Sequence, residues 1–178
     1  SSLFVPAVIL FLVSIPQAAE TDFSSLKFVL YGASPIADDT ILKAKEIMKC
    51  DLFQVYGLTE TAGAITILMP EDHDPEKGKL RSCGKALNSV EIKVVDDEGN
   101  EVKTGDIGEV ISKSPLNMKG YWNRPDATEE AIKDGWFYSG DAGFFDDEGY
   151  LYIHDRVKDM IVSGGENIYP AEVENALM

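Results

Sequence analysis

Hydrophobic positions follow two different patterns along the chain, and the change between them lies near Pro70. Before this point, residues 27–31 and 53–56 are apolar runs with strand character. Between them, residues 38–48 place their apolar side chains at helical spacing behind an acidic first turn, which suits the helix dipole. Strand, helix and strand at this spacing predict a βαβ unit, and hence a parallel, buried sheet.

The N-terminal run, residues 3–13, is strongly apolar. It predicts a buried strand at residues 3–5, followed by a helix that starts at Pro6. The run is too short to span a bilayer, and no Lys or Arg precedes Lys27, so neither a membrane span nor a secretory leader is expected. The polar residues 17–25 predict a linker. A chain that begins inside a core is expected to be a fragment of a longer protein, and its uncovered apolar surface would favour association between copies.

After Pro70, short alternating runs and turn-forming residues take over. The predicted strands lie at residues 90–94, 108–112, 136–138, 143–145 and 150–153, with a short helix at 125–132. On this prediction, the fold class is α/β plus β. Its parts are a partial parallel α/β subdomain at residues 1–78, a small antiparallel β-barrel-like module at 79–154, and the hinge and start of a C-terminal lid domain at 155–178.

The composition is that of a globular protein, because 44% of the 178 residues are hydrophobic and 26% are charged. A formal net charge of −15 disfavours nucleic acids and anionic membranes as partners. The acidic stretches 71–74 and 96–98 are expected to form surface loops. Cys50 and Cys83 form no C-x-x-C spacing, so neither a zinc site nor a disulfide framework is expected, and reduced thiols in a cytosolic protein fit best.

Residues 54–61, QVYGLTET, gather several groups that a nucleotide site uses. Tyr56 offers a flat ring to a base, and Gly57 lets a ligand approach the backbone. Thr59 offers a hydroxyl to a phosphate oxygen, and Glu60 offers a hard oxygen ligand to Mg²⁺. Open α/β sheets bind ligands beyond the carboxyl ends of their strands, which is where this stretch lies. Taken alone, it would be better explained as a strand, a glycine turn and a helix cap.

Three further motifs follow the same logic. Residues 32–35, GASP, end a neighbouring strand, where small side chains and backbone groups would meet a flat base edge. Asp141 follows an aromatic strand, and its carboxylate can hold two ribose hydroxyls. Residues 155–159, DRVKD, place a basic pair before a glycine-rich bend, where Arg156 would reach ribose or phosphate. Each motif also has a structural alternative: a strand-to-helix turn, a turn aspartate, and a surface run of ion pairs.

Together and in this order, these motifs closely resemble the adenylate-forming superfamily, which includes acyl-CoA synthetases, luciferases and peptide-synthetase adenylation domains. The resemblance runs from Phe28 to Leu177 and includes a further hallmark, Gly120-Tyr121-Trp122 after Gly108-Glu109. Residues 164–174, GGENIYPAEVE, resemble the acyl-CoA synthetase branch of the superfamily. Four or five ordered motifs rarely coincide, so the joint resemblance is specific.

The resemblance implies a role for each matching residue. The adenine and acyl sites would be formed by one set of residues: Gly32, Ala33, Ser34, Gln54, Tyr56 and Gly57. Adenine would stack on the tyrosine ring. The phosphates, the metal and the ribose would be bound by a second set: Thr59 at the α-phosphate, Glu60 at Mg²⁺ and Asp141 at the ribose hydroxyls.

Further roles are implied toward the C-terminus. Ile153 would lie near the ribose, and Arg156 would assist there. Lys158 falls at the hinge about which the C-terminal domain of such enzymes rotates between two half-reactions, and it is grouped with Thr59 and Glu60 as catalytic. Gly164 and Gly165 would lie near the pantetheine tunnel.

The resemblance implies a reaction in two steps. A carboxylate attacks the α-phosphate of ATP to give acyl-AMP and pyrophosphate, and the thiol of CoA then displaces AMP to give a thioester. ATP or AMP, Mg²⁺ and CoA are therefore the expected cofactors and co-substrates, and a small-molecule carboxylic acid is the expected substrate. Catalysis would come mainly from positioning and charge neutralisation.

Two elements of the resembled family have no counterpart here: its Lys-containing phosphate loop and the catalytic lysine of its C-terminal domain. The chain is therefore expected to be an inactive part of an acyl-CoA synthetase. Two alternatives stay open, a carboxylate-adenylating enzyme that does not use CoA and a non-catalytic nucleotide-binding or interaction module. A cytoplasmic location, with or without peripheral contact to a membrane, is expected, and the identity of the acid is left open.

Overall fold

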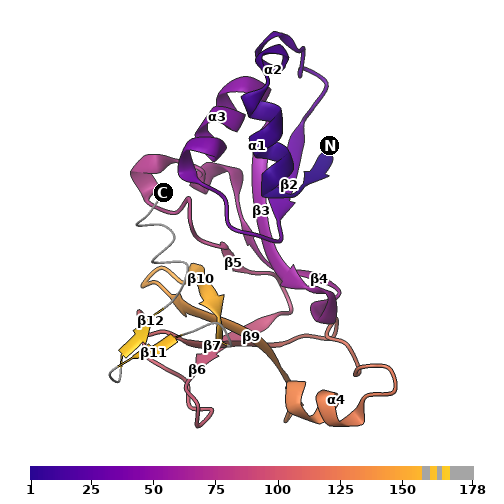
Figure 1. Cartoon of the computed structure of the whole chain (residues 1–178), viewed down its shortest axis with the longest axis vertical. Helices are drawn as coiled ribbons and strands as arrows, with labels where there is room; N and C mark the ends of the chain where they lie inside the picture. Colours follow the sequence, from indigo (N-terminus) through magenta and orange to yellow (C-terminus); the bar gives the residue numbers. More distant parts are fainter. Residues whose placement is uncertain (158–160, 164–165, 169–178) are drawn as a thin grey trace.

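The computed structural model describes residues 1–157, 161–163 and 166–168. Its chain builds an upper region, in which helices pack on a mixed sheet, and a lower region formed by a second, antiparallel sheet (Figure 1). The expectation of an α/β part followed by a β part is therefore confirmed. The predictions for Lys158, Gly164 and Gly165 lie outside the described residues.

The first sheet has five strands in chain order, and only part of it is parallel. The strands are β1 (Ser2–Phe4), β2 (Phe28–Gly32), β3 (Asp51–Leu58), β4 (Gly63–Leu68) and β5 (Lys85–Ala86). The first three pair in parallel, as the βαβ pattern predicts. β4 and β5 pair antiparallel, so the predicted parallel pairing holds for β1, β2 and β3 and does not extend to the rest of the sheet. The 3-10 turn η1 (Thr59–Thr61) joins β3 to β4, and this connection is too short for a parallel crossover.

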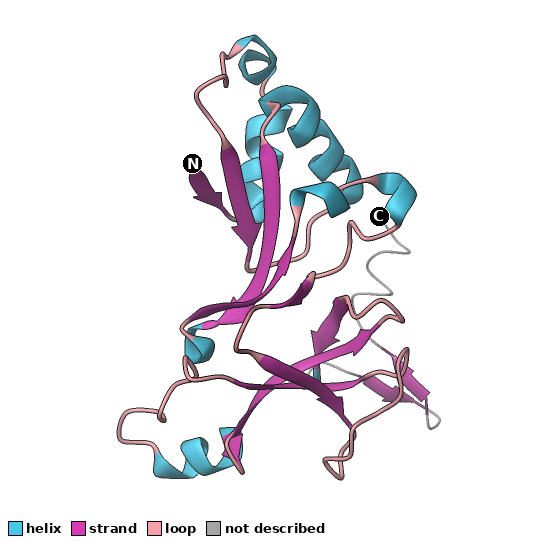
Figure 2. Cartoon of the chain, turned by 180° about the vertical axis from the view of Figure 1, so that it is seen from behind, coloured by secondary structure: helices cyan, strands magenta, loops and turns pink. Residues whose placement is uncertain are grey.

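Helices lie against one face of this sheet, as the view from behind shows (Figure 2). They are α1 (Pro6–Ser14), α2 (Pro16–Glu20) and α3 (Asp38–Met48). α3 starts with two acidic residues in its first turn and ends at Lys49, which takes the left-handed conformation with φ 49°. α2 covers residues 17–20 of the predicted linker 17–25, so that prediction is wrong there, while residues 21–25 form neither a helix nor a strand. Pro16 occupies the first turn of α2, where its fixed φ favours a helix start.

The hydrophobic core of the upper region lies between α1, α3 and the sheet. Its buried members are Ile9, Val13, Val29, Tyr31, Ile41, Ala44, Met48, Leu52 and Leu80. The three members on α3 recur every three to four residues, so they form one face of the helix, as the apolar periodicity predicts. This packing fixes the start of β3 and thereby the position of the motif at its far end.

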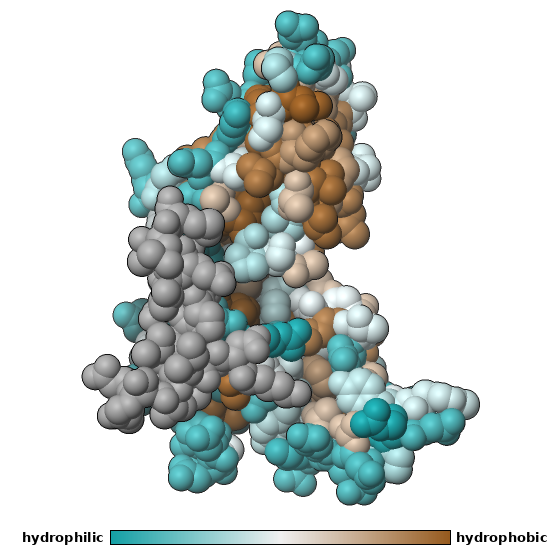
Figure 3. All heavy atoms as spheres, viewed as in Figure 1, coloured by the Kyte–Doolittle hydropathy of each residue, from teal (hydrophilic) through white to brown (hydrophobic). Residues whose placement is uncertain are grey.

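The N-terminal strand and helix form where predicted, but part of their apolar surface is uncovered by the described residues. The strand at residues 3–5 is not buried, since Leu3 is 70% and Val5 48% exposed. α1 also exposes Leu10 and Phe11. Hydrophobic side chains accordingly gather on the surface over the upper region (Figure 3). β1 is an edge strand, and α1 packs on α3 with one side only. Within the described residues, no helix has the length and apolar character needed to cross a membrane.

The predicted surface loop at residues 71–74 contains a fully buried histidine, His73. Its Nε2 lies 2.9 Å from the Tyr31 hydroxyl, and its Nδ1 lies 2.8 Å from the carbonyl oxygen of Met69. The 3-10 turn η2 (Pro70–Asp72) precedes the histidine, and a second such turn, η3 (Pro75–Lys77), follows it. The surface prediction is therefore wrong for His73, because two hydrogen-bond partners inside the fold replace water around the ring.

The second sheet is antiparallel, with strand order β10-β9-β7-β6 and β8 paired to β9. The strands are β6 (Glu91–Val95), β7 (Gly108–Lys113), β8 (Ile132–Lys133), β9 (Trp136–Phe145) and β10 (Leu151–Arg156). β9 is one long strand where two short ones are predicted. The predicted short helix is present as α4 (Pro125–Ala131), and the strands β11 (Ile161–Ser163) and β12 (Glu166–Ile168) pair antiparallel. Among the described residues, no pairing closes the second sheet into a barrel.

Candidate active site

The motif at the end of β3 lies in an irregular part of the first sheet. β3 continues through Gly57 and Leu58, and its register with β4 shifts between Tyr56 and Gly57. A side chain at Gly57 would overlap the backbone of Gly63 on β4. The close approach that this glycine permits in the structure is therefore that of a neighbouring strand.

The motif in β9 lies in a second irregularity. Two pairs with β7, Glu109 with Ala142 and Ile111 with Tyr138, leave residues 139–141 opposite a single residue of β7. Bulges of this kind bend a strand and turn a side chain in a new direction, and they occur often beside active sites. The predicted ribose ligand lies inside this bulge. The motif looks like a strand break in the sequence, whereas in the structure the strand continues through it.

The two irregularities meet in a cluster of three side chains. Tyr56 donates a hydrogen bond from its hydroxyl to Asp141 Oδ2 over 2.6 Å, and Arg156 Nε lies 2.9 Å from Asp141 Oδ1. Arg156 also donates from Nη1 to the carbonyl oxygen of Ser139 over 3.2 Å. The cluster joins β3 of the first sheet to β9 and β10 of the second. Three residues that the sequence analysis assigned to one nucleotide site are thus in direct contact.

Burial governs the protonation of this cluster. It raises the pKa of Asp141 above its ordinary value, although the Tyr56 hydrogen bond and the Arg156 charge act in the opposite direction and the charge of Glu60 raises it further. Burial also raises the pKa of Tyr56 well above its ordinary value, and the neighbouring Asp141 adds to the effect. Tyr56 therefore keeps its proton at neutral pH and serves as a donor.

Residues of a loop in the lower region donate hydrogen bonds to Glu60. Its Oε1 accepts a hydrogen bond from the Tyr121 hydroxyl over 2.9 Å, and its backbone oxygen accepts one from the amide of Met118 over 2.6 Å. Thr59, the predicted phosphate ligand, is exposed at the start of η1. Thr61 is buried instead, and its Oγ1 accepts a hydrogen bond from the amide of Leu58 over 3.0 Å, so it has a structural task.

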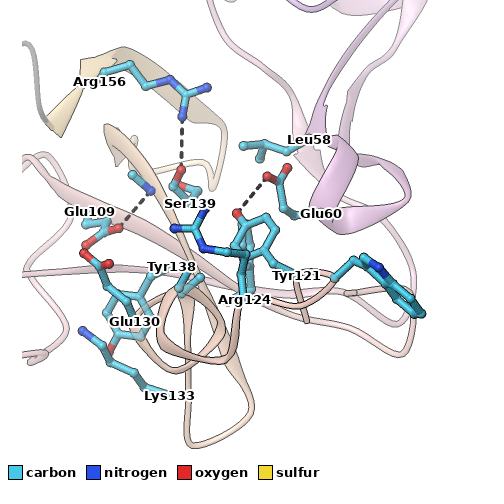
Figure 4. Close-up of a pocket in the computed structure, with 15 residues that line it drawn as sticks. Leu58, Glu60, Glu109, Tyr121, Arg124, Glu130, Lys133, Tyr138, Ser139 and Arg156 are labelled. Atoms are coloured by element: carbon cyan, nitrogen blue, oxygen red, sulfur yellow. Dashed lines mark hydrogen bonds between the residues drawn. The ribbon is translucent and has the colours of Figure 1, made fainter. Parts of the chain in front are cut away.

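A cleft of about 900 Å³ opens beside these groups. It is lined by Leu58, Glu60, Glu109, Tyr121, Trp122, Arg124, Ala127, Glu130, Ala131, Lys133, Phe137, Tyr138, Ser139, Gly140 and Arg156. Figure 4 shows Glu60 with its Tyr121 partner and Arg156 with its Ser139 partner around the same space. Acidic and basic side chains both reach this cleft, so it can bind an anion and a cation side by side.

Residues 32–34 are placed apart from this cleft. Gly32 ends β2, and a side chain there would overlap the backbone of Val55 on β3. Ala33 takes a positive φ of 73°, a conformation that is uncommon for a residue with a side chain. Ala33 and Ser34 are exposed, so their backbone and side-chain groups are open to a ligand.

Two further predicted residues pack beside the cluster. Gln54 donates from Nε2 to the sulfur of Cys83 over 3.7 Å, and its buried Oε1 has no hydrogen-bond partner among the described residues. Burial raises the pKa of Cys83 to about 11, and both Cys50 and Cys83 are free thiols. Ile153 packs against the hydrophobic core of the second sheet, together with Tyr56.

Three site residues were not assigned roles from the sequence: Glu109, Tyr121 and Ser139. Tyr121 donates to Glu60, and Ser139 accepts from the amide of Asp141 over 3.0 Å. Glu109 accepts from the amide of Gly140, the residue before Asp141, over 2.9 Å. Glu109 and Tyr121 belong to motifs that were noted only as hallmarks of the resembled family. Their place in these motifs was the only sequence signal for them, because the contacts that define their roles join residues far apart in the chain.

A magnesium ion bound with ATP fits the chemistry of Glu60. Among the residues that the structure describes, no group of three or more His, Cys, Asp or Glu side chains gathers as a metal cluster. Mg²⁺ commonly binds to one or two carboxylates and completes its shell with waters and substrate phosphates. A single half-buried carboxylate at the edge of the cleft suits that mode of binding.

Comparison with known proteins agrees with this geometry. Residues 2–122 match the family model described as AMP-binding enzyme. The chain is 42% identical over 174 residues to the long-chain-fatty-acid–CoA ligase FadD13 of Mycobacterium tuberculosis, covering 98% of this chain and 34% of the ligase. It is 40% identical over 173 residues to the fatty acid–[acyl-carrier-protein] ligase ScoC of Streptomyces coeruleorubidus, covering 97% of this chain and 33% of that protein.

Solved structures show the same fold. The O-succinylbenzoate coenzyme A synthetase of Bacillus subtilis in complex with ATP and magnesium ion matches with a TM-score of 0.88 and 38% identity, covering 100% of this chain and 36% of the synthetase. The amide bond synthetase McbA of Marinactinospora thermotolerans matches with a TM-score of 0.90 and 35% identity, covering 97% of this chain and 35% of that one. The chain thus spans about a third of the length of these relatives. Because the family model covers more than half of the chain, the chain belongs to the AMP-binding enzyme family.

Proposed function

We propose that the complete gene product containing this chain is an AMP-forming acid–CoA ligase. In the first step, a carboxylate oxygen forms a bond to the α-phosphorus of ATP, and the bond from that phosphorus to pyrophosphate breaks. In the second step, the sulfur of CoA bonds to the acyl carbon, the bond to AMP breaks, and the thiol proton leaves. The family match and the CoA ligases among the relatives support this proposal.

The nucleotide roles rest on the cluster of Tyr56, Asp141 and Arg156. Asp141 accepts a hydrogen bond from Tyr56 and forms an ion pair with Arg156 in this structure, so its oxygens are oriented acceptors that ribose hydroxyls can use. The Tyr56 ring presents a face on which adenine stacks, with Gln54 and Gly57 beside it. The exposed Ala33 and Ser34, together with Gly32 and Ile153, complete the proposed adenine, acyl and ribose surroundings.

The phosphate side of the site is proposed at η1. Thr59 contacts the α-phosphate, and Glu60 holds the Mg²⁺ that accompanies ATP. When bound, this ion supplies positive charge against the phosphates. The roles implied by resemblance for Lys158 as hinge, and for Gly164 and Gly165 near the pantetheine tunnel, stand as proposals outside the described residues. The same holds for a division into residues 1–78, 79–154 and 155–178, a cytoplasmic location, peripheral membrane contact, self-association and a place in fatty-acid metabolism.

One observation carries the proposal: Asp141 and Tyr56 lie 85 positions apart in the chain, yet they are hydrogen-bonded, and Arg156, which pairs with the same carboxylate, lines the cleft together with Glu60. The test is acid-dependent exchange of labelled pyrophosphate into ATP by the complete gene product, over a panel of fatty, aryl and small acids. We expect exchange with at least one class of acid and formation of the acyl-CoA when CoA is added. Absence of exchange with every acid would instead favour a non-catalytic nucleotide-binding module.

A second candidate shares the first step and differs in the acceptor. The similar proteins include a fatty acid–[acyl-carrier-protein] ligase and an amide bond synthetase. In such a case, pyrophosphate exchange would proceed while CoA remained unacylated, and the acyl group would pass to a carrier-protein thiol or to an amine. Mass spectrometry of the products with each of the three acceptors distinguishes these outcomes.

A further inference from the structure

The bulge that carries Asp141 is held in place by side chains rather than by a regular ladder of backbone bonds. On β7, a single residue faces the three bulged residues 139–141. The amide of Gly140 donates to Glu109 Oε1 over 2.9 Å, and the amide of Asp141 donates to Ser139 Oγ over 3.0 Å. Ser139 in turn donates from its hydroxyl to the carbonyl oxygen of Val110 over 2.6 Å.

Two charged side chains contact the backbone of the bulge: Arg156 donates to the carbonyl oxygen of Ser139, and Glu109 accepts from the amide of Gly140. Glu109 lies on β7, it lines the cleft, and Figure 4 shows its carboxylate directed at a backbone nitrogen of the bulge. A hydrogen bond to an ionised acceptor is stronger than one between neutral groups. Gly140, which receives this contact, has a left-handed φ of 71°, a conformation that few other residues adopt readily. Glu109 therefore fastens the least regular point of β9.

The position of this contact connects it to the nucleotide site. Gly140 directly precedes Asp141, whose carboxylate is aimed at Tyr56 on one side and Arg156 on the other. A rotation of the peptide before Asp141 would redirect that carboxylate. We infer that Glu109 is a positioning residue: by holding the Gly140 amide, it fixes the direction in which Asp141 presents its oxygens to the ribose hydroxyls of ATP. The inference rests on the ribose role of Asp141 in the proposed function.

Direct binding of the nucleotide by Glu109 is the weaker explanation. Its Oε1 already accepts the Gly140 amide, and a second carboxylate would repel the phosphates of ATP. A purely structural role is the other alternative. The two roles differ in one measurable way. A general loosening of the sheet would weaken the binding of every nucleotide, whereas misdirection of Asp141 weakens the binding only of a nucleotide that has the ribose hydroxyls.

The experiment compares two nucleotides by isothermal titration calorimetry on the complete gene product: ATP and 2′,3′-dideoxy-ATP, which lacks both ribose hydroxyls. We expect Glu109→Ala to weaken ATP binding about tenfold and 2′,3′-dideoxy-ATP binding less than about twofold. Glu109→Gln retains an acceptor oxygen and should recover most of the lost preference. Glu91→Ala, which removes an exposed carboxylate from neighbouring β6, is the matched control and should retain the wild-type preference.

Two further variants make the result decisive. Glu109→Asp keeps the charge and shortens the reach, so it should reproduce the loss of preference and replaces Glu109→Ala if that variant does not fold. In an Asp141→Asn background, Glu109→Ala should reduce the preference no further, because the residue it positions is already changed. An equal loss for both nucleotides, or an unchanged preference, would overturn the inference. If Asp141→Asn alone leaves the preference intact, the ribose role in the proposed function fails, and the inference fails with it.

Discussion

Two tyrosines on adjacent strands of the first sheet make the same kind of contact and serve different ends. On β2, Tyr31 is hydrogen-bonded to His73 over 2.9 Å, and on β3, Tyr56 is hydrogen-bonded to Asp141 over 2.6 Å. Both hydroxyls have a titratable partner from a distant part of the chain. The two pairs differ in what surrounds them: the first is closed inside the upper region, and the second is paired with Arg156, which lines a cleft.

The Tyr31–His73 pair uses every polar atom of the histidine ring within the fold. Nδ1 must carry a proton because the carbonyl of Met69 can only accept, and Nε2 therefore accepts from Tyr31. Tyr31 and His73 are both 0% exposed. The backbone oxygen of His73 also accepts from the ammonium of Lys45 on α3 over 2.5 Å. No atom of this pair can reach a ligand, so the pair fastens a loop to the sheet and the helix.

The Tyr56–Asp141 pair has a third member, Arg156, that can move away from Asp141. Asp141 is itself buried, but Arg156, which binds its other oxygen, has a side chain that is 54% exposed and lines the cleft. A ligand can therefore displace an exposed arginine without opening the core. The second pair is therefore open to a ligand through Arg156, whereas the first pair has no member that faces open space.

The largest expected effect is on stability, from His73→Ala. The variant leaves the Tyr31 hydroxyl buried without an acceptor and creates a cavity, so we expect the free energy of unfolding to fall by about 3 kcal/mol. Urea unfolding of the complete gene product measures it. The affinity for ATP, measured below the unfolding transition, should be unchanged.

The double variant His73→Ala, Tyr31→Phe is the control for this effect. Removing the hydroxyl as well removes the unsatisfied group, so the pair of changes should destabilise less than the sum of the single ones. Asp141→Asn tests the open pair in the same assay and should lower the free energy of unfolding by less than about 1 kcal/mol. Equal losses of stability for His73→Ala and Asp141→Asn would break the distinction between the two pairs.

The next effect is on nucleotide binding, from Tyr56→Ala. If adenine stacks on the ring, its loss should weaken ATP by about 1–3 kcal/mol, or roughly 5- to 150-fold. Tyr56→Phe keeps the ring and removes the hydroxyl, so it should retain most of the affinity. Calorimetric titration with ATP measures both variants. A loss in Tyr56→Phe as large as that in Tyr56→Ala would assign the effect to the Asp141 hydrogen bond and not to stacking.

Elements with strong local patterns were predictable from the sequence. The apolar periodicity of residues 38–48 and the adjoining strands fixes α3 and the parallel pairing of β2 with β3, since both depend on near neighbours. α2 was missed because Pro16 opens a helix too short for a periodic signal. The continuity of β9 was missed because a strand bulge and a strand break have the same composition at residues 139–141.

The site was predictable as a set of motifs and not as a set of contacts. Ordered motifs identified Tyr56, Asp141 and Arg156, but their mutual bonds arise from packing two sheets together, which no local pattern encodes. His73 shows the reverse failure. Its acidic neighbours indicate a surface loop, and only the hydroxyl of Tyr31, 42 positions away, explains why the ring is buried.

The smallest expected effect separates the two pairs by pH. Burial lowers the pKa of His73 below its ordinary value of 6.5, while the hydrogen bond to Met69 acts in the opposite direction. As the pH falls through 6.5, His73 becomes protonated in the unfolded chain but stays neutral in the folded chain. Its contribution to stability is therefore present above pH 6.5 and is lost as the pH falls below that value. The slope cannot exceed about 1.4 kcal/mol per pH unit, and we expect the free energy of unfolding to fall by about 1 kcal/mol per unit just below the ordinary pKa.

Urea unfolding between about pH 7.5 and 5.5 measures this slope. His73→Gln should remove it, whereas Asp141→Asn should not, because an aspartate with a raised pKa changes stability with the opposite sign. A slope that survives His73→Gln would show that another group titrates there and that the closed pair is not its source.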